Sequence, residues 1–302
     1  GGGGGNGPNN FSGGDAGGGQ PPLGAYNQLY KTTCAATQTT PGSPNILLSV
    51  NTGNGAIVET SPVLSLDGSQ VAFVQRSSSG TTGTSTDSLN AGQTAHLVLL
   101  KWASNPTTVG LTTVTTAAYR TCTAPCMTAF PLRANNQNSS PYVDYANDVL
   151  YVGDAYGRLH RFNGVFNGTP AAAASWPVTL SPGNMLSSPV FDSASNRVFV
   201  GSDVSERVND TNTGTGGLLH AVNAADRSFV SSGQITAFRN DVSNENVKMT
   251  GVRDGAIVDS LAQRVYAFVE SDTTTTCGGG TTRKAGYQFP TNFSNGRLGA
   301  AQ

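Results

Sequence analysis

Two of the three histidines occupy matching places in a repeated stretch, and histidine can bind a metal or carry a proton. His160 and His220 each follow a leucine, whereas His96 lies out of register with them. If the repeats surround a channel, the two side chains could be metal ligands on it. A repeat also reuses one packing arrangement at equivalent positions, and these residues give no symmetric set of three histidines. We therefore expect His160 and His220 to be structural.

Three aspartates also recur at one place of the repeat, and paired carboxylates can hydrolyse glycosidic bonds. They are Asp144, Asp192 and Asp259, and another copy of the repeat has Ser65 instead. Each aspartate comes where a strand should meet its turn, and a carboxylate there commonly accepts hydrogen bonds from backbone N–H groups. Serine can take the same role. The pattern therefore predicts turn residues, and we expect no catalytic residue among them.

A polar insertion over residues 203–217 carries oxygen-bearing side chains, which are the ligands that calcium prefers. The candidates are Asp203, Glu206, Asp210 and Asn212. Their spacing lacks the glutamate that closes an EF-hand loop. We expect a solvated loop and no resident cofactor, with calcium as the alternative.

The four cysteines permit three disulfide pairings. Cys122 and Cys126 flank a proline in "TCTAPC" and are close enough for a small local loop, so we expect them to be joined. Cys34 and Cys277 are the second expected pair. Because no C-x-x-C spacing occurs, a redox motif or a zinc ribbon lacks its ligands. Disulfides indicate an oxidising compartment, and hence a secreted or surface protein.

A motif that occurs four times must position these residues. Residues 139–153 (SSPYVDYANDVLYVG) and 187–201 (SSPVFDSASNRVFVG) align without gaps, and residues 60–74 and 255–268 match them. In each copy an apolar run, a polar turn and a second Val-rich run follow one another. This pattern predicts a β-hairpin.

Proline opens three of the four copies, at Pro62, Pro141 and Pro189. The first position of a strand suits proline because no interior hydrogen bond of the sheet is lost there. Two copies are followed by a further strand-like piece, residues 158–164 and 218–230. The predicted unit is therefore a sheet of about four antiparallel strands that returns roughly every 50 residues.

Sheets that recur in this way bury their faces against one another as blades. The predicted fold class is all-β: a β-propeller of four-stranded antiparallel blades, with an incomplete or irregular ring. The repeat units lie near residues 45–102, 115–164, 170–230 and 235–290. We expect the Gly-rich residues 1–24 to be a flexible leader and residues 25–302 to be the propeller domain.

The composition excludes two kinds of partner. Charged residues make up 12% of the chain and the net charge is −1, so we expect no basic surface for nucleic acid. Apolar runs such as residues 97–100 are only as long as a strand, so we expect no membrane insertion.

The stretch "SSPVFDSASNRVFVGS", followed by "GGLLHAVNAADRSFV", resembles the repeat of pyrroloquinoline-quinone-type (PQQ-like) β-propellers. The resemblance covers roughly residues 45–270. The whole layout looks like a group of large secreted bacterial proteins that brings no known activity with it, and it implies a secreted or cell-surface location in a bacterium. The tryptophan that usually ends such a repeat is absent from the corresponding turns, as is the adjacent cysteine pair of many quinone-binding enzymes. We therefore expect no quinone to bind.

These observations predict a non-catalytic secreted or cell-surface propeller that acts as a structural, adhesive or assembly module. Four units are fewer than the about seven or eight blades usual in that family, so unclosed sheets should pair with other protein chains. Copies of the chain itself, in an oligomer or fibre, are the expected partners, unless the chain is part of a longer propeller.

The alternative function is a carbohydrate-binding protein or a quinone-dependent enzyme with its site at the propeller channel. Such a site needs charged side chains from several blades to converge. The candidates are Arg158, Arg161, Arg197, Arg253 and Arg264.

Overall fold

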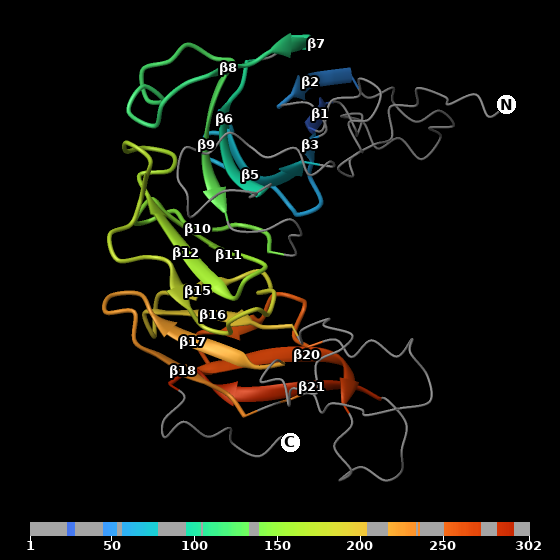
Figure 1. The fold of residues 1–302 in the computed structure, drawn as a ribbon, viewed down its shortest axis with the longest axis vertical. Helices are drawn as coiled ribbons and strands as arrows, with labels where there is room; N and C mark the ends of the chain where they lie inside the picture. Colours follow the sequence, from blue (N-terminus) through green and yellow to red (C-terminus); the bar gives the residue numbers. More distant parts are fainter. Residues whose placement is uncertain are drawn as a thin grey trace, which may run out of the picture. The chain divides into compact units, whose positions relative to one another are not determined.

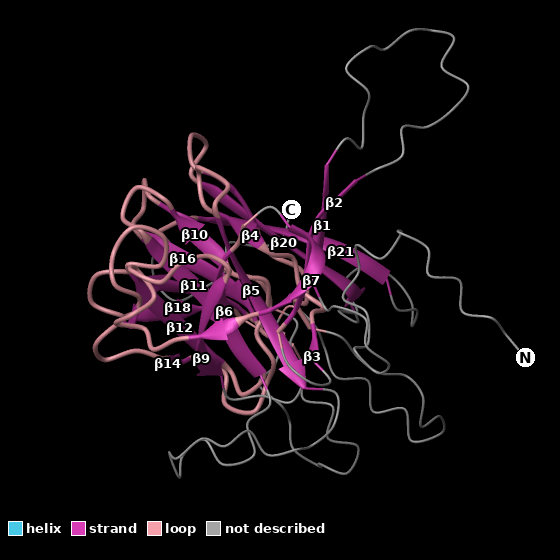
Figure 2. Cartoon of the chain, turned by 90° about the horizontal axis from the view of Figure 1, so that it is seen from above, coloured by secondary structure: helices cyan, strands magenta, loops and turns pink. Residues whose placement is uncertain are grey.

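The computed structural model describes residues 23–27, 45–52, 56–77, 95–103, 105–132, 139–203, 217–233, 235, 251–272 and 283–292. Every regular element in these ranges is a β-strand (Figure 1), and the rest of their backbone forms turns and loops (Figure 2). None of these ranges contains a helix long and apolar enough to cross a membrane. The chain divides into two compact units, residues 1–131 and 132–302.

The first unit contains a small and a large sheet. In the small sheet, β2 (Asn45–Asn51) pairs antiparallel with β1 (Leu23–Asn27) and parallel with β7 (Asn105–Gly110). The large sheet consists of β3 (Ala56–Ile57), β4 (Val63–Leu64), β5 (Gln70–Ser77), β6 (Ala95–Lys101), β8 (Thr112–Thr113) and β9 (Cys126–Leu132). The continuous apolar runs of β5 and β6 are buried and form much of the core.

The described residues of the second unit form three antiparallel sheets, which we call the first, second and third blades. The first blade contains β10 (Tyr142–Asp144), β11 (Val149–Gly153), β12 (Arg158–Asn163), β13 (Ala171–Ala172) and β14 (Val178–Thr179). The second contains β15 (Val190–Asp192), β16 (Arg197–Gly201), β17 (Leu219–Asn223) and β18 (Phe229–Ser231). The third contains β19 (Ile257–Asp259), β20 (Arg264–Asp272) and β21 (Arg283–Pro290).

The four copies of the repeat form hairpins with one register. The corresponding cross-strand pairs are Tyr142–Tyr151, Val190–Phe199, Ile257–Tyr266 and Val63–Ala72. The gap-free alignment of the sequence repeats therefore predicted the strand pairing correctly.

The hairpin turns of the three blades end on a residue with left-handed backbone. Asp148, Asn196 and Gln263 have φ angles of 53°, 53° and 52°. Aspartate and asparagine tolerate this conformation better than most residues. In the first unit, Gly68 takes a φ of 70° one place earlier in the alignment. The turn residues thus fix where each return strand begins.

The second blade lies between the first and the third (Figure 1). Val198 and Val200 belong to one core cluster with Tyr151 of the first blade, and Phe199 belongs to another with Val265 of the third. Because side chains alternate across a strand, β16 buries apolar residues on both of its faces. Stacking between blades therefore explains the uninterrupted apolar sequence of this strand.

Two glycines let the blades approach each other closely. A Cβ atom at Gly153 would lie 2.6 Å from the Cβ of Leu186, and one at Gly201 would lie 2.3 Å from Cγ1 of Val252. Leu186 and Val252 each precede the hairpin of the next blade. The glycine that ends a return strand thus makes room for the blade that follows.

The predicted all-β class with propeller-type blades is confirmed. The expected four strands per blade occur in the second blade, whereas two short strands, β13 and β14, both pair with β12 in the first. Pro177, which cannot donate a backbone hydrogen bond, lies between these two strands, and Pro170 precedes the first of them. The third blade has three strands among its described residues. The limits of the leader and of a propeller domain over residues 25–302 stay predictions.

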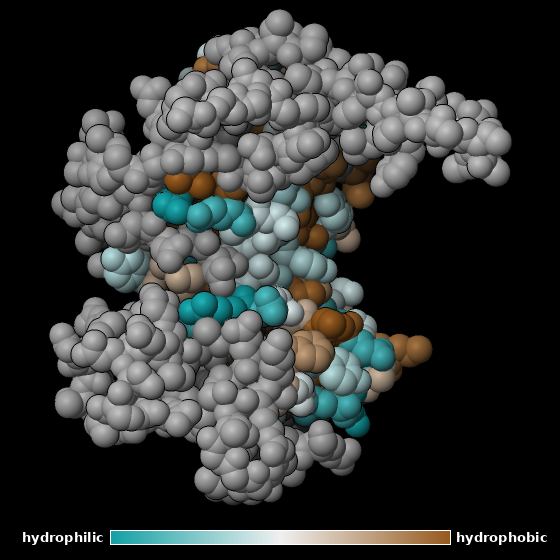
Figure 3. Space-filling view, turned by 90° about the vertical axis from the view of Figure 1, so that its right-hand side faces the viewer, coloured by the Kyte–Doolittle hydropathy of each residue, from teal (hydrophilic) through white to brown (hydrophobic). Residues whose placement is uncertain are grey.

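On the side of the chain shown in Figure 3, brown apolar residues alternate with teal hydrophilic ones.

Candidate functional site

The three repeated aspartates cap the turns of their hairpins. Their backbone donors are the N–H groups of Ala146 for Asp144 (3.2 Å), Ser195 for Asp192 (3.0 Å) and Ala262 for Asp259 (2.8 Å). In the first unit, the Ser65 hydroxyl accepts a hydrogen bond from the backbone N–H of Gln70 at 2.9 Å. The contacts are those of turn residues.

Asp192 also joins two blades. Its carboxylate accepts a hydrogen bond from the hydroxyl of Ser260, which lies in the hairpin turn of the third blade. Burial raises the pKa of Asp192, but hydrogen bonds from Ser195 and Ser260 lower it, and the net pKa lies below the usual range. The ionised form therefore holds the two turns together.

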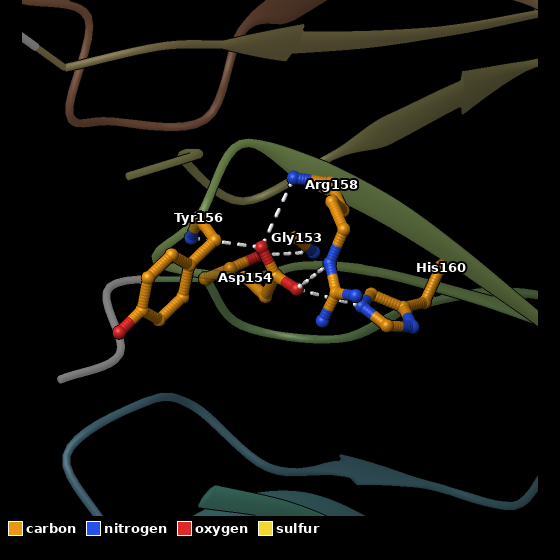
Figure 4. A network of polar contacts seen from close by, with 6 residues as sticks. Gly153, Asp154, Tyr156, Arg158 and His160 are labelled. Carbon is orange, nitrogen blue, oxygen red and sulfur yellow. Dashed lines mark hydrogen bonds and ion pairs between the residues drawn. The ribbon is translucent and has the colours of Figure 1, made fainter. Parts of the chain in front are cut away.

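A polar network around the buried Asp154 follows β11 (Figure 4). One carboxylate oxygen accepts hydrogen bonds from the backbone N–H groups of Tyr156 (2.9 Å) and Arg158 (3.0 Å). The other accepts from Nε of Arg158 (2.7 Å) and lies 2.9 Å from Nε2 of His160. Burial raises the pKa of Asp154, whereas His160 and Arg158 lower it, and the net pKa lies below the usual range. This network fixes the start of β12.

Ser202 occupies the place of Asp154 in the second blade. Nε2 of His220 lies 3.2 Å from the Ser202 hydroxyl, and Nδ1 lies 2.7 Å from that of Ser231. Burial lowers the pKa of His220 to about 4, so the ring is neutral at neutral pH. The two repeated histidines, His160 and His220, thus have different partners within their own blades and do not share a site.

Asp203 is the one calcium candidate among the described residues. Its carboxylate accepts hydrogen bonds from the backbone N–H of Gly251 and from Nε of Arg253, both at 2.8 Å. Glu206, Asp210 and Asn212 lie outside the described residues. No three His, Cys, Asp or Glu side chains gather into a metal site within the described ranges. Calcium binding by this insertion stays the untested alternative to a solvated loop.

The arginines that a catalytic site would need have separate partners. These are Asp154 for Arg158, Asp203 for Arg253 and the carbonyl of Ala224 for Arg161, while Arg197 and Arg264 stand opposite Asp192 and Asp259 in strand register. Arg158, Arg161 and Arg253 thus contact their own blade or an adjacent segment of the second unit, and Arg197 and Arg264 lie in the hairpins of different blades.

Cys122 and Cys126 are joined by the predicted disulfide. The bond ties the turn at residues 116–121 to the first residue of β9. Cys34 and Cys277 lie outside the described residues, so their pairing stays a prediction.

The third blade presents an apolar surface that we call the outer face. It is formed by Ile257, Asp259, Arg264, Tyr266, Phe268 and Gln288. The opposite face of β20 is buried against the second blade. On the outer face, Ile257 is 59% exposed and Phe268 is 46% exposed. In the two preceding blades, Tyr151 and Phe199 hold the position of Tyr266 and are fully buried against the next blade.

Phe268 stands where the preceding blades have Gly153 and Gly201. Its ring covers Gly286 on the neighbouring strand, where a Cβ atom would lie 3.2 Å from the ring. Sequence reasoning missed this face because Phe268 looks like any apolar strand residue. The sequence signal that could have indicated the outer face is the phenylalanine at the last position of the repeat, where the two preceding copies have glycine.

No family model and no curated protein matches the chain. Among solved structures, the chain is similar to the GH74 enzyme of Niastella koreensis, with 17% identity and a TM-score of 0.37, over 78% of this chain and 29% of that one. It is also similar to BamB from Moraxella catarrhalis, with 11% identity and a TM-score of 0.32, over 76% of this chain and 62% of that one. The chain thus spans less than two thirds of either protein, and a likeness of this degree carries no argument about function.

Proposed function

We propose that this chain is a non-catalytic, exported assembly module with PQQ-like repeats, which joins a second copy of itself through the outer face. The observation that carries the proposal is the exposure of Ile257 and Phe268 on a face that the preceding blades bury. Soluble proteins seldom leave contiguous apolar surface without a partner.

The replacement of glycine by Phe268 favours a second copy over a further blade of the same kind. A following blade would bring a side chain like Leu186 or Val252 against this position, and the phenylalanine fills that space. Two copies related by a two-fold axis would instead bring the outer face against itself. Asp259 and Arg264 are both on this face, so an acid of one copy can meet an arginine of the other.

Export is supported by the Cys122–Cys126 disulfide, because such bonds persist mainly in oxidising compartments. As part of the proposal, the module has no resident cofactor. Titration of the purified protein with the quinone and with calcium, followed by absorbance and thermal stability, tests that part separately.

Size-exclusion chromatography with light scattering, over a range of protein concentrations, tests the assembly. We expect a dimer for the wild type and dissociation for the double variant Ile257→Thr/Phe268→Thr. Threonine keeps the β propensity of both positions. Complete burial of one large apolar side chain contributes about 1.5–3 kcal/mol, so the dissociation constant should rise at least about tenfold.

Leu66→Thr is the control. Leu66 is a large apolar residue that is 84% exposed, and it lies in the turn of the repeat hairpin of the first unit. This variant should dimerise like the wild type. A wild type that stays monomeric at every concentration, or a double variant that dimerises unchanged, would overturn the proposal.

A further inference from the structure

A pocket of about 450 Å³ lies between the first and second blades. Its polar lining is Asp144, Asn147, Arg161, Asn163 and Asn196. These side chains come from β12 and from the hairpins of both blades. The volume falls within the range of about 300–1,000 Å³ that small-molecule sites occupy.

Arg161 is held at the pocket wall by two contacts. Its Nη1 donates a hydrogen bond to the carbonyl of Ala224 at 2.8 Å, and its guanidinium lies 5.9 Å from the centroid of the Tyr151 ring. Its Nε is buried and has no hydrogen-bond acceptor among the described residues. Because this Nε is inaccessible, a ligand in the pocket could meet only the Nη groups of Arg161.

The charges of the pocket balance. Asp144 is the acid and Arg161 the base of its lining. An anion would be attracted by Arg161 but repelled by Asp144, and a cation would meet the reverse. The carboxamides of Asn163 and Asn196 offer donors and an acceptor, and Asn147, whose Nδ2 donates to Asp144 at 2.7 Å, keeps one N–H and its oxygen. The lining therefore suits an uncharged ligand that donates and accepts hydrogen bonds over its whole surface.

We propose that this pocket binds an uncharged carbohydrate of one or two sugar units. A hydroxyl group both donates and accepts, which matches the carboxamides, while Asp144 accepts from one hydroxyl and Arg161 donates to another. Phe191 lines the pocket and supplies apolar surface for the C–H groups of a sugar ring. The site lies apart from the outer face of the third blade, so it stands independently of the proposed assembly.

Chemical-shift perturbation of the isotope-labelled full chain tests the site. The probes are glucose, galactose, N-acetylglucosamine, cellobiose and lactose, with glucuronate and glucosamine as charged counterparts. We expect at least one neutral sugar to give saturable shifts, and the charged counterparts to bind more weakly. Failure of every neutral sugar to saturate, or tighter binding of a charged one, would overturn the assignment.

Two variants locate the binding. Asn163→Ala removes an exposed carboxamide at the end of β12 and should weaken binding about fivefold. Arg161→Lys keeps the charge but loses the planar donors, and it should weaken binding about tenfold or more. Asn167→Ala is the control, an exposed asparagine that does not line the pocket, and should change the affinity less than about twofold.

If Arg161→Lys fails to fold, the affinity of Asn163→Ala alone tests whether the sugar binds in this pocket. Equal weakening by Asn163→Ala and Asn167→Ala, or no weakening by Asn163→Ala, would place the sugar elsewhere and refute the proposal.

Discussion

At the scale of single residues, the position directly after the return strands β11 and β16 holds a residue that contacts the repeated histidine of the same blade. In the first blade this position is Asp154, which contacts both His160 and Arg158. In the second blade it is Ser202, which contacts His220. The carboxylate balances the charge of Arg158, whereas the serine leaves His220 among neutral partners. A buried ring without a nearby carboxylate loses its proton more readily, so one repeat position gives two electrostatic environments.

We expect His220 to make stability depend on pH. Burial lowers the pKa of its folded state from 6.5 to about 4, so between these values the unfolded chain binds a proton that the folded chain does not. The free energy of unfolding should be highest above pH 6.5 and should fall by about 3 kcal/mol as the pH drops to about 4. Urea unfolding at about pH 7 and about pH 4.5 measures this loss, which His220→Gln should reduce.

Asp154 changes the free energy of unfolding in a lower pH range than His220 does, so the two contributions can be told apart. Its folded pKa lies below 3.8, so its stabilisation is present above about pH 4 and is lost only as the pH falls through the folded pKa. Equal losses in the wild type and His220→Gln between the two pH values would contradict the assignment to His220.

At the scale of elements, the hairpins could be predicted from the sequence because their signals are local. An opening proline, an apolar run, a turn capped by aspartate and a Val-rich return strand follow one another within about 15 residues. The parallel pairs β2–β7 and β8–β9 could not be predicted from the sequence, since parallel strands are not joined by a tight turn that would mark the pairing.

The candidate sites depend on how the blades pack against one another, and this packing could not be predicted from the sequence. The pocket around Arg161 needs the first and second blades side by side, and the outer face is recognised only once the buried faces of the other blades are known. The repeat did point to Asp144 and Asp192 as turn residues, because a cap lies next to the backbone that it binds.

Because the blades approach each other closely at one glycine and not at another, we expect alanine to destabilise the protein at the first and not at the second. Gly201→Ala would place a Cβ atom 2.3 Å from the side chain of Val252, so we expect a loss of about 1–3 kcal/mol in the free energy of unfolding. Gly255→Ala is the matched control, because its Cβ atom would meet ordinary contacts with Ser188 at 3.4 Å and beyond. Thermal and urea unfolding compare the two, and similar losses would show that close approach is not the cause.

At the scale of the whole molecule, the chain has few charges and almost none in excess. Its 17 basic and 18 acidic residues leave a net charge of −1, and charged residues make up 12% of the sequence. Copies of the chain therefore repel one another little. In the proposed dimer, apolar contact then has to supply most of the free energy of association, and Asp259 of one copy facing Arg264 of the other would set the orientation of the two copies.

This balance predicts how salt affects the proposed dimer. Raising NaCl from about 0.1 M to about 1 M shortens the Debye length from about 10 Å to about 3 Å, which weakens exposed ion pairs but leaves apolar burial intact. We expect the dissociation constant to rise less than about threefold, and sodium sulfate at equal ionic strength to tighten the dimer because sulfate is excluded from protein surfaces. Sedimentation equilibrium in the two salts measures both effects. A dimer that falls apart in NaCl would be held by charge, and Ile257 and Phe268 would then not be its main contacts.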